Sequence, residues 1–94
     1  MTHEGLDFDL YETEGRLVVE IALPGVLEPD IDIAFEPLAL CVRAERSEAS
    51  GAWHHRGLPR GSLTSRVPLP GPVEMIEAAF ELGILRIELR RIDA

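Results

Sequence analysis

The fold is decided by the stretch Ala78-Ala79-Phe80-Glu81-Leu82-Gly83-Ile84-Leu85. An alternating run leads into Gly83, and a bulky apolar pair follows the glycine at once. Glycine tolerates a positive φ, which allows the chain to reverse within one tight hairpin turn. The stretch therefore predicts a β-hairpin that closes a chain built from strands.

Alternating apolar residues continue through the rest of the chain and predict strands over 17–23, 31–36, 40–44, 63–69, 76–82 and 85–89. A short first strand is expected over 7–12. Glycine or proline residues end most of these runs, so the chain is expected to be an all-β antiparallel sandwich. Good helix formers in 73–82 leave a helix there as the alternative. The residues expected to share one face of their strand are Leu17, Val19, Ile21, Leu23, Ile31, Ile33, Phe35, Leu40, Val42, Ala44, Leu63, Ser65, Val67, Leu69, Ile76, Ala78, Phe80, Leu82, Leu85, Ile87 and Leu89.

Length, charge and cysteine content narrow the class of protein. Ninety-four residues are expected to form one domain over 1–94. Residues 1–36 hold ten carboxylates and one arginine, and the whole chain has a net charge of −8, which disfavours binding to nucleic acid. A single cysteine excludes a disulfide within the chain. With no apolar run of membrane length and no leader pattern, we expect a cytoplasmic protein without membrane partners.

The polar residues give no pattern typical of an enzyme, a metal site or a cofactor site. His54 and His55 are adjacent, so their side chains point opposite ways on an extended chain, and no further ligand stands at metal spacing nearby. Cys41 has no base in evidence, which favours a packed or half-exposed thiol over a nucleophile or redox sensor. No glycine-rich phosphate loop indicates ATP. An enzyme on a sandwich scaffold remains an alternative that a pocket joining His55, Cys41 and a carboxylate would support.

Two features indicate binding surfaces. The segment 47–61 is polar and glycine-rich and contains Trp53, and loops of this length in compact domains are usually either functional or disordered. The expected strands 31–36 and 76–82 place small alanines beside large apolar residues. Such a combination leaves space for an apolar side chain from another protein, so we hypothesise a groove at a sheet edge.

Several segments, in order and at proper spacing, resemble the α-crystallin domain of the small heat-shock proteins, of bacterial type. The resemblance extends from about Asp7 to Leu89. It includes the strand that ends in Leu23-Pro24-Gly25, the segments 40–46 and 53–56, and a closing run over 76–85 similar to the family's Ala-x-x-x-x-Gly-Val-Leu signature.

The resemblance implies an immunoglobulin-like β-sandwich that acts as an ATP-independent chaperone, holding unfolding client proteins without refolding them. It also implies a homodimer in which an exchange loop at about 47–61 pairs with the partner's strand near 8–12. The dimer interface is then expected to include Phe8, Leu10, Tyr11, Trp53, His54, His55, Arg56 and Arg60. The implied groove for a client or an Ile-x-Ile tail includes Ile31, Ile33, Phe35, Ile76, Ala78 and Phe80.

The chain also departs from the family pattern. The arm 1–6 and the tail 91–94 are short, so large oligomers are not expected for this chain as given. Leu82 stands where Asn, Asp or Gly commonly precedes the turn glycine, and Ser65 stands where an arginine is frequent. A co-chaperone or adaptor sandwich that recognises folded partners is the alternative function, although such modules usually lack the long loop.

Overall fold

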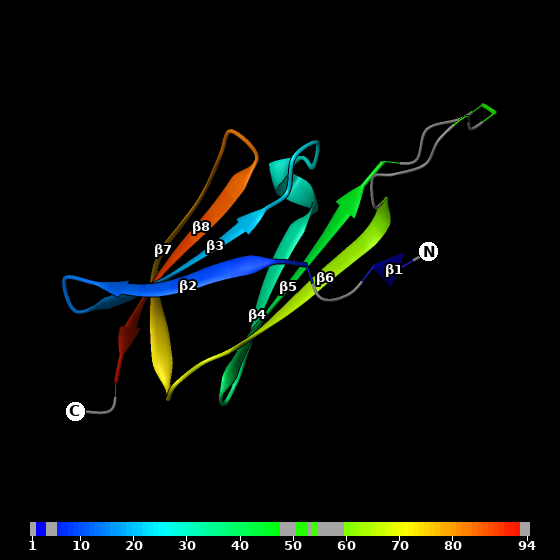
Figure 1. Cartoon of the computed structure of the whole chain (residues 1–94). Helices are drawn as coiled ribbons and strands as arrows, with labels where there is room; N and C mark the ends of the chain where they lie inside the picture. Colours follow the sequence, from blue (N-terminus) through cyan, green and yellow to red (C-terminus); the bar gives the residue numbers. More distant parts are fainter. Residues whose placement is uncertain (1, 4–5, 48–50, 53, 55–59, 93–94) are drawn as a thin grey trace.

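Two four-stranded β-sheets pack face to face in the computed structural model, which describes residues 2–3, 6–47, 51–52, 54 and 60–92 (Figure 1). The antiparallel sandwich predicted from the alternating pattern is confirmed, apart from one short parallel pair that the pattern did not predict. The strands are β1 (Thr2–His3), β2 (Phe8–Thr13), β3 (Arg16–Ala22), β4 (Ile31–Glu36), β5 (Ala39–Arg46), β6 (Gly61–Pro68), β7 (Val73–Glu81) and β8 (Ile84–Arg91), with one 3-10 turn, η1 (Glu28–Asp30).

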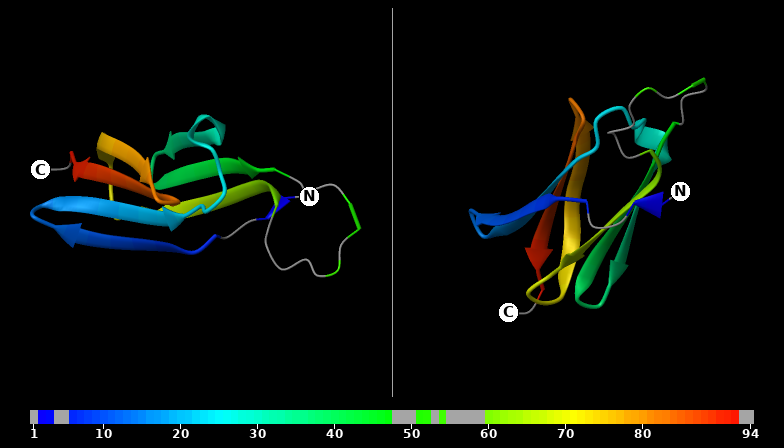
Figure 2. Two further views of the ribbon diagram at one scale, coloured as in Figure 1. Left: turned by 90° about the horizontal axis from the view of Figure 1, so that it is seen from above. Right: turned by 45° about the vertical axis from the view of Figure 1, so that its right-hand side comes forward.

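The strand order leaves β1 and β4 at the edges of one sheet, and β2 and β7 at the edges of the other. Sheet A has the order β1-β6-β5-β4, in which only the β1–β6 pair is parallel. Sheet B has the order β2-β3-β8-β7 and is antiparallel throughout. In Figure 2, β1 and the end of β8 lie at opposite ends of the molecule. Among the residues with described positions, no helix is long and apolar enough to cross a membrane.

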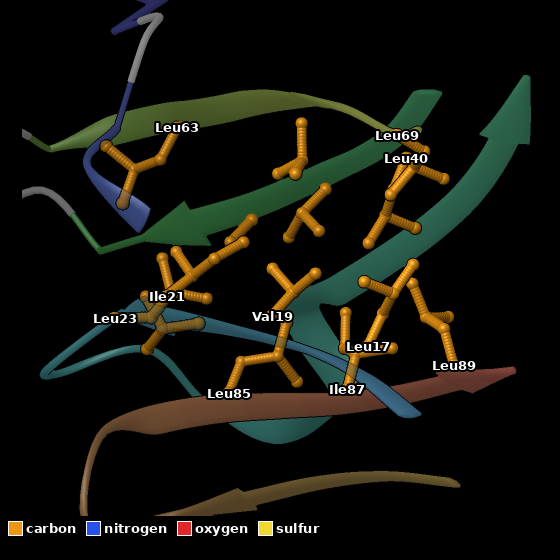
Figure 3. Close-up of a cluster of buried hydrophobic side chains, with 14 residues drawn as sticks. Leu17, Val19, Ile21, Leu23, Leu40, Leu63, Leu69, Leu85, Ile87 and Leu89 are labelled. Atoms are coloured by element: carbon orange, nitrogen blue, oxygen red, sulfur yellow. The ribbon is translucent and has the colours of Figure 1, made fainter. Parts of the chain in front are cut away.

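The core is the apolar layer between the two sheets (Figure 3). Alternation in β3 places Leu17, Val19 and Ile21 in this layer, where each is almost completely buried. Burial of this apolar area stabilises the fold by roughly 1.5–3 kcal/mol for each large aliphatic side chain. The predicted inner positions of β5, β6 and β8 are also buried, namely Leu40, Val42, Ala44, Leu63, Ser65, Val67, Leu85, Ile87 and Leu89.

Residues 73–81 form strand β7, not the alternative helix. The prediction that Ile76, Ala78, Phe80 and Leu82 share one face is wrong at both ends of that set. A β-bulge between Met75 and Glu77 makes Ile76 an extra residue without a partner in register, and this interrupts the alternation. Leu82 lies beyond the end of the strand, in the turn, and is fully exposed.

The β7–β8 hairpin turns through Leu82 and Gly83, whose φ angles of 52° and 80° are both positive. This is the pattern of a two-residue type I′ turn, which Asn-Gly fits best. Gly83 is required for a second reason, because a Cβ there would lie 3.1 Å from the Pro24 Cα. Leu82 has no such freedom, so the turn stores backbone strain.

We expect Leu82→Asn to stabilise the fold by about 1 kcal/mol, because Asn adopts the left-handed conformation more easily than Leu. Leu82 is fully exposed, so its removal takes no apolar contact from the core. Urea unfolding measures the change, with Leu82→Ala as the control that keeps the strain. An Asn variant no more stable than the Ala variant would contradict the assignment of strain to this residue.

Candidate functional site

Strand β2 presents an open edge of sheet B. Its neighbour is β3, and the described part of the chain places no strand on its other side. Figure 2 shows the β2–β3 hairpin, with β2 in mid blue along the outer side of the lighter blue β3. All six residues of β2 are exposed, including Phe8, Leu10 and Tyr11. Unpaired backbone groups on such a strand can pair with a strand of another chain.

A network of polar and charged side chains holds β2 against the rest of sheet B. The Tyr11 hydroxyl donates to Glu20 Oε2 at 3.0 Å. Arg86 Nε lies 3.6 Å from the same oxygen, and Arg86 Nη1 donates to Glu88 Oε1 at 2.6 Å. Arg16 Nη1 donates to Glu88 Oε2 at 3.1 Å. The network therefore links β2, β3 and β8 across their outer face.

Val18 is the residue beneath this network. It stands opposite Tyr11 on one side and Glu88 on the other, and the strand alternation turns it away from the core. Val18 is nevertheless completely buried, because the charged side chains cover it. Sequence alternation missed this position, since its burial depends on neighbours in two other strands.

The hydrogen bond from Arg86 also lowers the pKa of the Glu88 carboxyl below its usual value.

The edge strands β4 and β7 enclose a small apolar groove. Its cavity of about 140 Å³ opens between the two sheets, and its lining is Glu28, Ile31, Ile33, Ala78, Ala79, Phe80 and Leu85. Four residues of the hypothesised groove therefore come together here, two from each strand: Ile31, Ile33, Ala78 and Phe80.

Phe35 and Ile76 do not line this cavity. Phe35 belongs to the same inner face of β4, opposite Leu40, but its side chain is 44% exposed. Ile76 is displaced by the bulge and is exposed as well. Sequence reasoning also missed Glu28 and Leu85 as lining residues, because η1 and β8 reach the groove only through the tertiary fold.

A second hollow lies beside β2, with a volume of about 490 Å³. Leu10 and Leu17 form one side of it, and residues 68–70 form the other. It adjoins the open β2 edge, so apolar surface is available where the sequence predicts a dimer contact.

The predicted exchange loop leaves and rejoins sheet A at one place. Arg46, at the end of β5, stands opposite Gly61, at the start of β6. Arg60 Nη1 donates to the Ser47 carbonyl at 2.8 Å and so ties the two ends together. His54 is exposed. The predicted interface residues Trp53, His55 and Arg56 lie outside the described residues.

A family model for the Hsp20/alpha crystallin family matches residues 9–94. The chain belongs to this family. Small heat shock protein C2 of Rickettsia felis is 32% identical over 87 residues, which cover 86% of this chain and 56% of that protein. Small heat shock protein IbpB of Klebsiella pneumoniae is 31% identical over 75 residues, covering 78% and 53%. The chain thus spans little more than half the length of these relatives.

Solved structures of Hsp20 proteins share the fold. The hspA structure from Xanthomonas axonopodis superposes with a TM-score of 0.81 at 24% identity, covering 95% of both chains. A small heat-shock protein from Xylella fastidiosa gives a TM-score of 0.78 at 23% identity, covering 95% of this chain and 87% of the other. At these identities the likeness establishes the α-crystallin β-sandwich and nothing finer.

The position where an arginine is frequent in α-crystallin domains holds a buried serine here. Ser65 Oγ donates to the Leu6 carbonyl at 3.1 Å, and this bond secures the chain before β2. The neighbouring Arg66 points to the outer face of sheet A, where it donates to Glu36 Oε1 at 3.0 Å. The arginine of this region is therefore paired within its own chain.

Cys41 and Arg66 both form hydrogen bonds to Glu36 on the outer face of sheet A of this α-crystallin domain. The thiol donates to Glu36 Oε2 at 2.9 Å, and this bond raises the pKa of Cys41. A raised pKa keeps the sulfur protonated, which makes it a poor nucleophile. The geometry agrees with the expected half-exposed thiol. No group of three or more potential metal ligands occurs among the residues that the structure describes.

We expect Glu88→Gln to lower stability near neutral pH and to flatten the fall of stability in acid. Because the folded state lowers the Glu88 pKa, the stabilisation is present above the usual glutamate value of 4.5 and disappears as the pH falls through the lowered value. Urea unfolding at about pH 7 and about pH 3.5 measures the effect. Glu14→Gln, in an exposed turn, is the matched control. Equal pH dependence in both variants would contradict a role for Glu88.

Proposed function

We propose that this chain is an ATP-independent chaperone that holds unfolding proteins and works as a dimer in the cytoplasm, without nucleic acid or membrane partners. The observation that carries the proposal is the Hsp20/alpha crystallin match over residues 9–94. Names of relatives matched over most of this chain, such as small heat shock protein C2, favour the same role. The open β2 edge and the β4/β7 groove offer the two kinds of surface that the proposal needs.

The dimer is proposed to form when the loop 47–61 of one protomer pairs with β2 of the other. Strand addition of this kind uses main-chain hydrogen bonds, which the open edge of β2 can supply. Phe8, Leu10 and Tyr11 are exposed on that strand and would contribute apolar contact. Within the loop, Trp53, His54, His55, Arg56 and Arg60 are the proposed interface residues.

Deletion of residues 50–58 is expected to give a monomer, because the proposed cross-subunit strand is then lost. The deletion leaves β5, β6 and the Arg60–Ser47 bond at the loop base in place. Sedimentation velocity measures the mass, and the far-ultraviolet circular dichroism spectrum checks that the sandwich remains. A deletion variant that stays dimeric would place the interface elsewhere.

The groove between β4 and β7 is proposed to receive an apolar side chain from an extended segment. Ile31, Ile33 and Phe80 are partly buried and pack against the main core, so the groove floor is continuous with it. Binding an apolar side chain there would gain roughly 25 cal/mol of free energy for each Å² of apolar area that is removed from water. Clients or an Ile-x-Ile segment of another protein are the proposed occupants.

Ile33→Asp is expected to weaken binding of an Ile-x-Ile peptide by at least about tenfold, because it puts a carboxylate into the apolar lining. Phe35→Asp is the matched control, since Phe35 lies on the same strand face but outside the lining. Isothermal titration calorimetry measures both affinities. Equal loss in the two variants would show that the lining does not select the peptide.

The chaperone role itself is tested by light scattering of a heat-labile client at rising ratios of this chain, without ATP. We expect scattering to fall as the ratio rises, because exposed apolar surface of the client is covered before it aggregates. A folded dimer that leaves scattering unchanged would contradict the role for this chain alone. Capture of a folded partner in the same buffer would instead support the adaptor function.

A further inference from the structure

The hollow beside β2 is a second place where the apolar layer reaches the surface. Leu10 stands opposite the buried Val19 in register, so its side chain lies on the core-facing side of β2. It is nevertheless 36% exposed, because β2 is the last strand of sheet B in the described part of the chain. On the other sheet, β1 pairs with β6 only at Ser62 and Leu63 and does not extend to residues 68–70. The hollow of about 490 Å³ therefore lies open at the β2 edge.

The lining of this hollow suits an apolar side chain. Its apolar surface comes from Leu10, Leu17, Pro68, Leu69 and Pro70. The lining also includes Tyr11 and Glu12, and both have partners. The Tyr11 hydroxyl donates to Glu20, and Arg91 donates to Glu12. An apolar occupant therefore leaves neither of these polar groups without a hydrogen bond.

A strand that joins the protein at this hollow would pair with β2 and not with the end of β6. Pro68 and Pro70 have no N–H group, so this part of sheet A offers side-chain surface and few hydrogen-bond donors. Strand β2 contains no proline, and its outer edge is free in the described part of the chain. Neighbouring strands lie about 4.8 Å apart, so the inward side chains of an added strand would lie over the hollow beside Leu10.

We propose that the hollow beside β2 receives the indole side chain of the partner's Trp53 and that this contact anchors the dimer. The inference rests on the proposed pairing of the loop with β2 and adds the side chain that secures it. Trp53 and Leu58 are the only large apolar residues of the loop 47–61. Pro59 follows Leu58 directly and cannot donate to a strand ladder, which makes Trp53 the better strand residue.

Tryptophan matches the hollow in size and chemistry. Its side chain buries about 150–250 Å² and packs well against proline rings, two of which belong to the lining. The indole N–H needs an acceptor where it is removed from water. The Glu12 carboxylate in the lining can accept this bond as well as the one from its arginine, because two carboxylate oxygens offer about four lone-pair sites.

The loop of the same chain is poorly placed to fill the hollow. It begins and ends beside the paired residues Arg46 and Gly61. Pro68 lies seven residues further along β6, roughly 23 Å away at the rise of an extended strand. Trp53 is seven residues from Arg46, so it would reach Pro68 only with that arm of the loop almost fully extended. A second copy, whose loop meets β2 directly, is therefore the proposed source of the indole.

Fluorescence tests the placement directly, because Trp53 is the only tryptophan of the chain. Sedimentation velocity defines the concentrations at which the protein is dimeric or monomeric. In the dimer we expect emission at shorter wavelength and slow quenching by acrylamide. On dilution to monomer, the emission should move to longer wavelength and quenching should become faster, because the indole then meets water.

A matched pair of variants assigns the signal to the hollow. Leu10→Ser removes part of its apolar wall, and we expect it to raise the dimer dissociation constant at least about tenfold and to move the dimer's emission to longer wavelength. Leu27→Ser makes the same change at an exposed leucine between β3 and β4, outside the lining, and should alter neither quantity. Circular dichroism checks that both variants keep the sandwich.

Changes at Trp53 test the contact without altering β2. We expect Trp53→Ala to raise the dimer dissociation constant at least about thirtyfold, and Trp53→Phe to raise it only about threefold, because a phenyl ring still fills part of the hollow. Leu10→Ser combined with Trp53→Ala should bind no more than about twofold more weakly than Trp53→Ala alone, since both changes remove the same contact.

The outcomes separate the anchor from the dimer. A dimer whose tryptophan emits as in water overturns the anchor and leaves the dimer in place. Shielded emission in both dimer and monomer places Trp53 on its own chain and also overturns the anchor. Equal effects of the two leucine variants, or additive losses in the combined variant, overturn the contact between Leu10 and Trp53. A protein that stays monomeric at every concentration overturns the proposed dimer, and the anchor with it.

Discussion

The apolar layer between the two sheets holds every other part of the structure in position. Side chains from β3 and β8 interdigitate with those from β5 and β6, and removal of this area from water is the main force that keeps the sheets together. Because a strand has only two faces, the same alternation that fills the layer also fixes which residues face outward. A shift of one residue in register would turn every core side chain of that strand to the solvent.

The apolar layer is covered by strands in the middle of the sandwich and reaches the surface at its edges. The proposed binding surfaces lie at these edges. Strands β4 and β7 are the outer strands on one side, so the apolar layer reaches the surface there as a groove. On the other side, β2 leaves its backbone edge unpaired, although the Tyr11–Glu20 bond and its neighbours hold it firmly to β3. The proposed dimer and the proposed client site therefore use different edges of one sandwich.

The sequence predicted those parts that depend on local alternation. The core faces of β3, β5, β6 and β8, the reversal at Gly83 and the half-exposed thiol of Cys41 all follow from residue types and their spacing. The bulge at Ile76 could not be predicted, because an extra residue looks like ordinary strand until its partner strand is known. Burial of Val18 was missed for a related reason, since the side chains that cover it come from distant segments.

Amide hydrogen exchange, followed with and without a heat-labile client, tests most directly the claim that two separate edges perform pairing and client binding. We expect amides of β2 to be protected in the dimer before any client is added, and to lose that protection on dilution to monomer. Addition of client should then slow exchange in β4 and β7 and leave β2 unchanged. Client-induced protection confined to β2, or spread evenly over both sheets, would contradict the account.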